Sequence, residues 1–204
     1  GIIISTKALK YISLSKRKST MKKFIDLLKH RRSCRQFSEE IIDNESIDYI
    51  LKSALMSPSG HRRTPWEFIV VEDKRTLKAL SVSKASGATL IEKAAAAIVI
   101  TADTTKTDVW IEDCSIASIN MQLAAEELGL GSCWVQIRLR EDSEGNSAND
   151  NVKLLLGIPE QFSVLSIIAL GHKEHESQPF DENDLKWNKV HRGKFENNNY
   201  KYGT

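Results

Sequence analysis

The segment spanning residues 108–128 most restricts how this chain can fold. Its pattern predicts one helix about 30 Å long, and Gly129 directly after it is typical of a helix C-terminus. The second half of the segment is apolar on most sides, with Ala117, Ile119, Met121, Leu123, Ala124, Ala125 and Leu128. A helix that is apolar nearly all round is buried. We therefore expect this helix in the core or in an interface between subunits, not on a free surface.

Helix and strand patterns alternate along the rest of the chain. Strand patterns cover residues 67–72, 95–102, 133–137 and 162–170. The second of these strands lacks polar alternation, which indicates burial on both faces. Helical patterns cover residues 22–30, 47–55, the surroundings of Leu77 and Leu80, and residues 152–156. We expect Asn44 to cap the second of these helices and Pro58 to end it. No linker divides the chain, so the alternation predicts a single α/β domain.

Length and charge limit the classes of function. The chain has 204 residues, enough for one domain with a substantial core. Its net charge of +2 lacks the concentrated positive excess that a DNA-coating protein needs. An anion site in this protein must therefore be a local feature.

The cysteines and the apolar runs of the sequence indicate where in the cell the protein is found. Cys34, Cys114 and Cys133 are widely spaced, which argues against a disulfide framework and fits a reducing cytoplasm. No apolar run reaches the roughly 18–20 residues that cross a bilayer. We therefore expect a cytoplasmic protein without a membrane contact.

The two ends of the chain differ from its middle. Residues 1–20 precede a natural start at Met21 and are interpreted as a leader, a remnant of the expression vector or an upstream extension; the alternative is a basic arm that binds an acidic partner. Residues 21–171 form the expected functional domain. Residues 172–204 are polar and extended but carry apolar side chains at Phe180, Leu185, Trp187, Val190, Phe195, Tyr200 and Tyr202. This tail either packs on another subunit, which we favour, or folds back on its own domain.

A cluster of basic residues follows the first helix. Arg31, Arg32 and Arg35 place three guanidinium groups around the hydroxyl of Ser33. Arginine matches phosphate oxygens with paired hydrogen bonds, so this spacing is typical of a phosphate site. Two further arginines, Arg62 and Arg63, follow the turn at residues 57–60. The alternative for both groups is a solvated basic face.

The order of five motifs adds a family resemblance. Along the chain these are RRSCRQFS, SPSG, PWEFIVVED, EDCSIASINMQLAAEELGLGSCWVQI and LGIPEQFSVLSIIALGH. Together they resemble the FMN-dependent nitroreductase family over about residues 21–195. The resemblance implies a three-layer sandwich of the α+β kind, with a central, mostly antiparallel sheet flanked by helices. It also implies an intertwined homodimer with FMN at the interface.

The resemblance further implies an activity. An NAD(P)H-dependent FMN oxidoreductase would pass hydride from NADH or NADPH through FMN to a flat, electron-poor acceptor by a ping-pong mechanism. The acceptor would be a nitroaromatic compound, a quinone or an enone. The alternative is a flavin-binding or redox-sensing protein on the same scaffold without such turnover.

The implied FMN site involves four parts of the sequence. Arg31, Arg32, Ser33 and Arg35 match the motif for the ribityl phosphate and the pyrimidine side of the ring. Pro58, Ser59 and Gly60 match a loop that reaches the flavin from the partner subunit. The strand beside the isoalloxazine ring is matched by Cys133, Trp134, Val135 and Gln136, and the end of the last strand, near the phosphate, by Gly171 and His172. No catalytic side chain is assigned.

Arg62 departs from the family pattern. Many relatives carry an asparagine amide at this position, whereas this chain has a guanidinium. A cation near flavin N1 would stabilise the anionic reduced flavin.

Other chemistry is less well supported. His172 and His175 lack a third metal ligand nearby, so we expect no metal site. An RNA-binding module would interleave aromatic residues with the arginines, which this chain does not do. We expect Cys34 to pack beneath the phosphate loop instead of acting as a redox sensor. The acidic pairs at residues 112–113 and 126–127 are expected on the solvated face of the long helix.

Overall fold

The computed structural model describes residues 23–195, so the interpretations of residues 1–20 lie outside the described part of the chain. Its centre is a four-stranded antiparallel sheet in the order β1-β2-β4-β3. The strands are β1 (Trp66–Val71), β2 (Ala96–Asp103), β3 (Leu130–Gln136) and β4 (Phe162–His172). All four fall where the sequence predicts strands.

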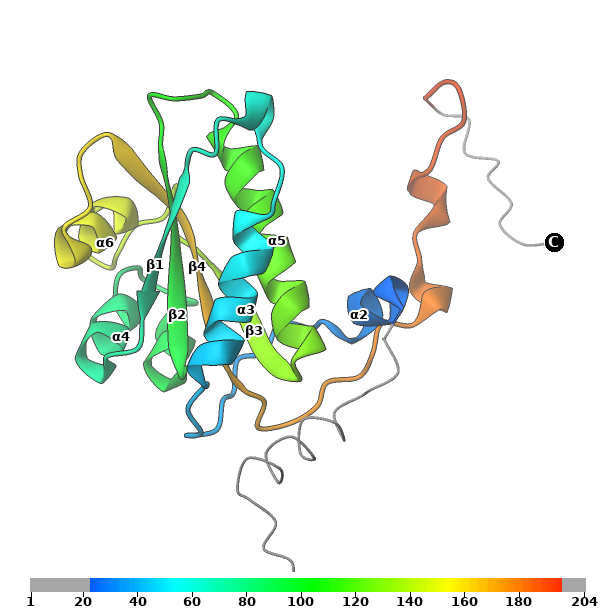
Figure 1. Ribbon diagram of the computed structural model, residues 1–204, viewed down its shortest axis with the longest axis horizontal. Helices are drawn as coiled ribbons and strands as arrows, with labels where there is room; N and C mark the ends of the chain where they lie inside the picture. The colour runs from blue at the N-terminus through cyan, green and yellow to red at the C-terminus, as the bar shows by residue number, and fades with distance from the viewer. Residues whose placement is uncertain (1–22, 196–204) are drawn as a thin grey trace, which may run out of the picture.

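Helices cover both faces of the sheet. On one face lie α3 (Asn44–Leu55) and the long helix α5 (Trp110–Glu127), and on the other α4 (Lys74–Ser81) and α6 (Ala148–Leu156) (Figure 1). This three-layer arrangement around an antiparallel sheet confirms the expected fold class. No helix among residues 23–195 is long and apolar enough to cross a bilayer.

Strand β2 shows why the layers form. Ile98 and Ile100 belong to the core cluster under α3 and α5, whereas Ala97 and Val99 belong to the cluster under α4 and α6. All four side chains are fully buried, because successive residues of a strand point to opposite faces. Full burial of an isoleucine side chain contributes about 1.5–3 kcal/mol. The apolar run in the sequence therefore supplies two cores at once.

The start of α3 corrects one expectation. The cap is Asp43, whose Oδ1 accepts a hydrogen bond from the backbone N–H of Ser46 at 2.8 Å, and Asn44 is the first helical residue. Asp43 has the extended backbone that lets a cap side chain turn back onto the helix.

The long helix α5 corrects another expectation. Asp113 and Glu126 are only 3% and 5% exposed, although the sequence suggested a solvated face. Asp113 meets the loop after α3, and Glu126 pairs with Lys173. The solvated side of α5 instead carries Ile116 and Ile119, which are 38% and 37% exposed. This exposure leaves an apolar strip that the described chain does not cover.

Residues 31–38 lie against the sheet at two paired glycines. Gly131 of β3 faces Gly171 of β4 in the register of the two strands. A Cβ on Gly131 would lie 2.7 Å from Cys34 Sγ, and one on Gly171 would lie 2.6 Å from Phe37 Cδ1. Both distances are too short for any side chain. The two glycines therefore make the room in which Cys34 and Phe37 pack.

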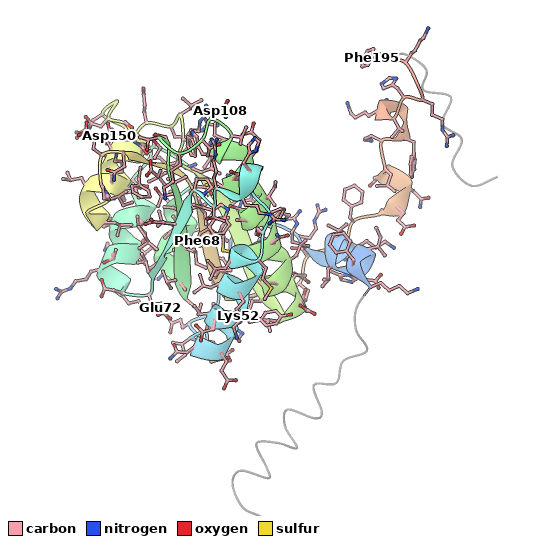
Figure 2. All side chains as sticks on the ribbon, turned by 45° about the horizontal axis from the view of Figure 1, so that its top comes forward. Lys52, Phe68, Glu72, Asp108, Asp150 and Phe195 are labelled. Carbon is pink, nitrogen blue, oxygen red and sulfur yellow. The ribbon has the colours of Figure 1, made fainter. Side chains whose placement is uncertain are left out.

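An arm extends from this body. It consists of α2 (Phe24–His30) and residues 178–195, which include the short helical turns Glu182–Asp184 and Trp187–Lys189. Phe180 N–H donates to the Lys29 carbonyl oxygen at 2.9 Å, and Lys29 pairs with Glu182. Figures 1 and 2 show the arm standing off the sheet, with Phe195 toward its far end. Residues 178–195 therefore stand off the sheet and contact α2 of the same chain, and the expected packing of the tail on another subunit stays a prediction.

The glycine contact gives a stability prediction. Gly171→Ala should destabilise the protein by about 1–3 kcal/mol, because the new methyl group overpacks the site of Phe37. Urea unfolding measures the change. The same substitution in a Phe37→Ala background should cost clearly less, and equal costs in both backgrounds would contradict the contact.

Candidate functional site

The arginine cluster lies at the outer edge of β3. Arg31 ends α2, its N–H donating to the Leu27 carbonyl oxygen. Ser33 then forms a parallel bridge with Ser132 of β3, and Cys34 N–H donates to the Ser132 carbonyl oxygen at 2.9 Å. The backbone thus holds the cluster against an edge strand.

The guanidinium groups of the cluster have few internal partners. No carboxylate among residues 23–195 forms an ion pair with Arg31 or Arg35. Arg32 stacks over the Phe180 ring of the arm, 5.7 Å from its centroid. An anion at this edge would therefore meet two uncommitted cations.

The outer edge of β3 continues beyond the cluster. Because the Ser132 carbonyl points outward, alternation along the strand turns the backbone groups of Trp134 and Gln136 outward too. Among the described residues, Ser33 is the one that pairs with β3 on the side away from β4. The backbone beside Trp134 and Gln136 is thus open to a ligand lying in line with the arginines.

The side chains of this stretch are fixed by one another. Trp134 Nε1 donates to Gln136 Oε1 at 2.9 Å, and Gln136 Nε2 donates to the Arg138 carbonyl oxygen at 2.9 Å. Both side chains are half-buried. This chain of hydrogen bonds holds a flat aromatic surface and an amide at the edge of the sheet.

The thiol of Cys133 interacts with residues from the predicted arginine cluster. Burial raises the pKa of its thiol, while Arg35, a hydrogen bond with Ser33 and Lys84 act in the opposite direction. Lys84 was not predicted from the sequence. Burial lowers its pKa, as does the charge of Arg140. Lys84 and Arg140 come from polar loops without a motif, so no signal in the sequence marked them.

The loop of residues 57–64 lies elsewhere. Gly60 N–H donates to Asp113 Oδ1 in the first turn of α5 at 2.9 Å. The arginine cluster lies beside β3 and α2, toward the other end of α5 (Figure 1). The helix between them has 18 residues and is about 27 Å long. One chain therefore does not bring Pro58, Ser59, Gly60 and Arg62 together with the arginine cluster.

That loop has an unusual backbone. His61, Arg62 and Thr64 have φ angles of 51°, 55° and 42°. The left-handed region costs a non-glycine residue on the order of 1 kcal/mol or more. Such a loop persists only where surrounding contacts impose it.

Gly171 and His172 have structural contacts within the chain. Gly171 admits Phe37, and His172 Nε2 lies 3.2 Å from the Ile41 carbonyl oxygen. His172 Nδ1 lies 3.6 Å from Glu40 Oε2. Both residues thus hold the segment that follows the arginine cluster, and their predicted place near a phosphate remains a prediction.

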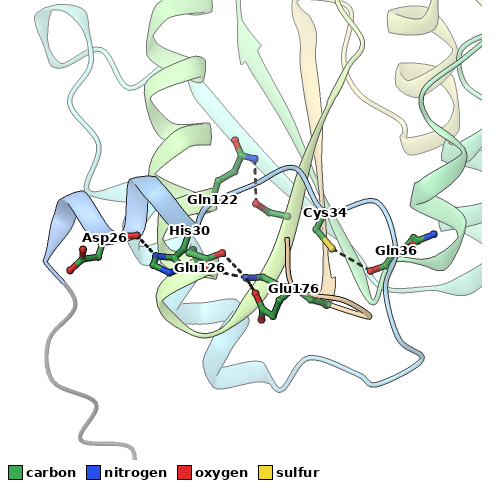
Figure 3. Close-up of polar contacts among 9 residues, drawn as sticks. Asp26, His30, Cys34, Gln36, Gln122, Glu126 and Glu176 are labelled. Atoms are coloured by element: carbon green, nitrogen blue, oxygen red, sulfur yellow. Dashed lines mark hydrogen bonds and ion pairs between the residues drawn. The ribbon is translucent and has the colours of Figure 1, made fainter. Parts of the chain in front are cut away.

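A buried ion pair braces the site from behind. Lys173 Nζ lies 2.8 Å and 3.1 Å from the two carboxylate oxygens of Glu126, and 3.4 Å from Glu176 (Figure 3). Burial acts to lower the pKa of Lys173, but the hydrogen bond and charge of Glu126 raise it overall. Gln122 Nε2 also donates to Ser132 Oγ at 3.3 Å. Helix α5 is thereby tied to β3 and to the start of the tail.

Comparison with known proteins gives consistent matches. Residues 28–172 match the model of the nitroreductase family. A protein of Archaeoglobus fulgidus, named as a candidate NADH dehydrogenase/NAD(P)H nitroreductase, is 38% identical over 181 residues, which are 86% of this chain and 100% of that protein. An FMN reductase (NADPH) of Bacillus subtilis is 27% identical over 175 residues, covering 74% of this chain and 66% of that protein.

A solved structure agrees with these matches. An FMN-dependent nitroreductase from Clostridium difficile superposes with a TM-score of 0.83 at 43% identity. The superposition covers 84% of this chain and 100% of that one.

The burial of the thiols predicts low reactivity. Burial raises the pKa of Cys34, Cys133 and Cys114, the last to about 12, so all three stay protonated at neutral pH. A thiol reagent such as DTNB should react slowly with the native protein and rapidly with all three cysteines after unfolding. A fast-reacting Cys34 in the native protein would contradict its packing beneath the arginine cluster.

Proposed function

The chain belongs to the nitroreductase family, and we propose that it is a cytoplasmic NAD(P)H-dependent FMN oxidoreductase. Its acceptor would be a flat, electron-poor molecule, either a nitroaromatic compound, a quinone or an enone. The observation that carries this proposal is the alignment of the arginine cluster with the open outer edge of β3. A phosphate at one end and a flat ring along the strand describe the shape of FMN.

The residues at this edge fit the cofactor. Arg31 and Arg35 have no carboxylate partner among residues 23–195, so they are available for a phosphate or for the polar side of the ring. The outward backbone groups of Trp134 and Gln136 would hold the polar edge of the ring. Arg35 and Lys84 add positive charge around Cys133, which would favour an anionic reduced ring.

The chain's own residues bind and orient in this mechanism. When bound, FMN would supply the hydride chemistry, accepting hydride from NAD(P)H and passing it to the acceptor in a ping-pong sequence. The arginine cluster anchors one end of the site, and the hydrogen-bonded pair of Trp134 and Gln136 fixes its wall. No side chain is required to move a proton at the reacting atoms in this proposal.

A second copy of the chain would complete the site. The loop of residues 57–64 and the arginine cluster lie toward opposite ends of α5, so we propose that each site takes its loop from the partner in a homodimer. Two exposed apolar regions support this arrangement. Phe24 and Ile25 of the arm are 64% and 54% exposed, and Ile116 and Ile119 line the open side of α5. Burying these surfaces against a partner would stabilise the dimer.

The FMN proposal is tested by absorption and binding. The purified protein should be yellow or should quench FMN fluorescence on titration, and NAD(P)H should bleach the flavin. Arg31→Ala and Arg35→Ala should each weaken FMN binding by about 1.5–3 kcal/mol, the contribution of a charged hydrogen bond. Arg75→Ala, on the exposed side of α4, is the matched control and should bind normally.

The outcomes of this test are distinct. A protein that never binds FMN would refute the proposal. Bleaching by NAD(P)H without reoxidation by any quinone or nitroarene would favour the redox-sensing alternative.

The shared site is tested by oligomeric state. Sedimentation should give a dimer, and Ile116→Glu with Ile119→Glu should shift it toward monomer, because charges would be buried on the α5 strip. FMN binding should fall together with dimerisation. A stable monomer that retains FMN would refute the shared site.

A further inference from the structure

Asp113 is a buried carboxylate that the fold alone does not explain. It lies in the first turn of α5 and is 3% exposed. Its Oδ1 accepts a hydrogen bond from Gly60 N–H at 2.9 Å. Its Oδ2 is buried and has no hydrogen-bond partner among the described residues. Burying a carboxylate with one unsatisfied oxygen lowers the stability of the fold. The hydrogen bond that Asp113 does form is therefore expected to have a function beyond stability.

That hydrogen bond connects α5 to the loop of residues 57–64. Gly60 lies so close to the helix that a Cβ on it would be 2.8 Å from Val109 Cγ2. The close approach brings the Gly60 N–H to the carboxylate. This hydrogen bond fixes the backbone of the loop at Gly60 against the first turn of α5.

Two further hydrogen bonds connect the loop to α5 and to the residues just before that helix. Asn120 Nδ2 donates to Ser57 Oγ at 2.8 Å, and the Arg63 guanidinium donates to the Lys106 carbonyl oxygen at 2.9 Å. Within the loop, Thr64 N–H donates to Ser59 Oγ at 2.9 Å. These bonds clamp the two ends of the loop, whereas Asp113 holds its middle.

The middle is where the backbone is strained. His61 and Arg62, directly after Gly60, both have left-handed φ angles that non-glycine residues avoid. Without an anchor at Gly60, these two residues would relax toward ordinary backbone angles. The direction of the Arg62 side chain would change with them.

We propose that Asp113 is a positioning residue for FMN binding, which acts through Gly60 to fix where Ser59 and Arg62 meet the cofactor. This inference rests on the proposed function. Asp113 does not touch the cofactor itself, and its role is to supply the oxygen that accepts the hydrogen bond of Gly60 N–H.

Two variants separate the hydrogen bond from the charge. Asp113→Asn keeps a carbonyl oxygen that accepts from Gly60 N–H, whereas Asp113→Ala removes the acceptor. Asp108→Asn is the matched control, because Asp108 is exposed and loses the same charge five residues earlier.

The first measurement needs no cofactor. Hydrogen exchange at the Gly60 amide of the FMN-free protein should be at least about tenfold faster in Asp113→Ala than in wild type, and within about threefold of wild type in Asp113→Asn. The control should match wild type. Unchanged protection in Asp113→Ala would overturn the anchoring of the loop.

The second measurement uses FMN. Asp113→Ala should weaken FMN binding about tenfold and make the midpoint potential of bound FMN more negative, because the proposed contact of Arg62 with the cofactor would be lost. Asp113→Asn should restore both values to near wild type. Equal losses in the two variants, or wild-type affinity in Asp113→Ala, would overturn the proposal.

Two further results complete the design. If Asp113→Ala does not fold, Gly60→Ala tests the same contact: it should weaken FMN binding, and Val109→Ala in the same chain should restore it by removing the clash. Failure of that rescue would overturn the proposal. A wild-type protein that binds no FMN would refute the proposed function, and the hydrogen exchange at Gly60 would still decide whether Asp113 anchors the loop.

Discussion

The contact of residues 31–38 with the paired glycines Gly131 and Gly171 determines the layout of the site. Because these two positions lack side chains, Cys34 and Phe37 pack directly on the sheet. The chain between them is held at the outer edge of β3, and the arginines are fixed in line with that strand. With larger residues at the glycines, the same cluster would stand away from the sheet and would face solvent.

The length of α5 imposes the second constraint. Its first turn holds the loop of residues 57–64 through Asp113, and its last turn holds the tail through Glu126 and Lys173. A straight helix keeps these two regions apart, so neither can move toward the other within one chain. The apolar strip of Ile116 and Ile119 lies between them on the same helix. Helix α5 thus sets both the separation of the two half-sites and the surface on which a second copy would join them.

The sequence predicted the regular parts of this fold well. Periodic apolar residues placed all four strands and the helices to within a few positions, since burial of one or both faces leaves a clear pattern. The cap at Asp43 was misplaced by one residue, because Asn44 is an equally good cap by type. The burial of Asp113 and Glu126 was missed, because two adjacent acidic residues have the same pattern whether one or neither is buried.

The site was predictable only in part. The arginine cluster and the strand of Trp134 and Gln136 carry motifs, and their alignment along one edge emerged from the fold. Lys84 and Arg140 carry no motif; the effect of Lys84 on Cys133 and that of Arg140 on Lys84 depend on how the loops are placed in the folded chain. Gly171 was assigned to the phosphate by resemblance, whereas its visible contact is with Phe37, a long-range contact that no local pattern encodes.

The open outer edge of β3 has a consequence for the protein without its ligand. An unpaired strand edge presents free N–H and C=O groups that a strand of another molecule can join, which is a common route to aggregation. In this fold, the groups of Trp134 and Gln136 are the exposed stretch of that edge. A flat molecule bound there would cover these groups, and would thereby block the edge against pairing with a strand of another molecule.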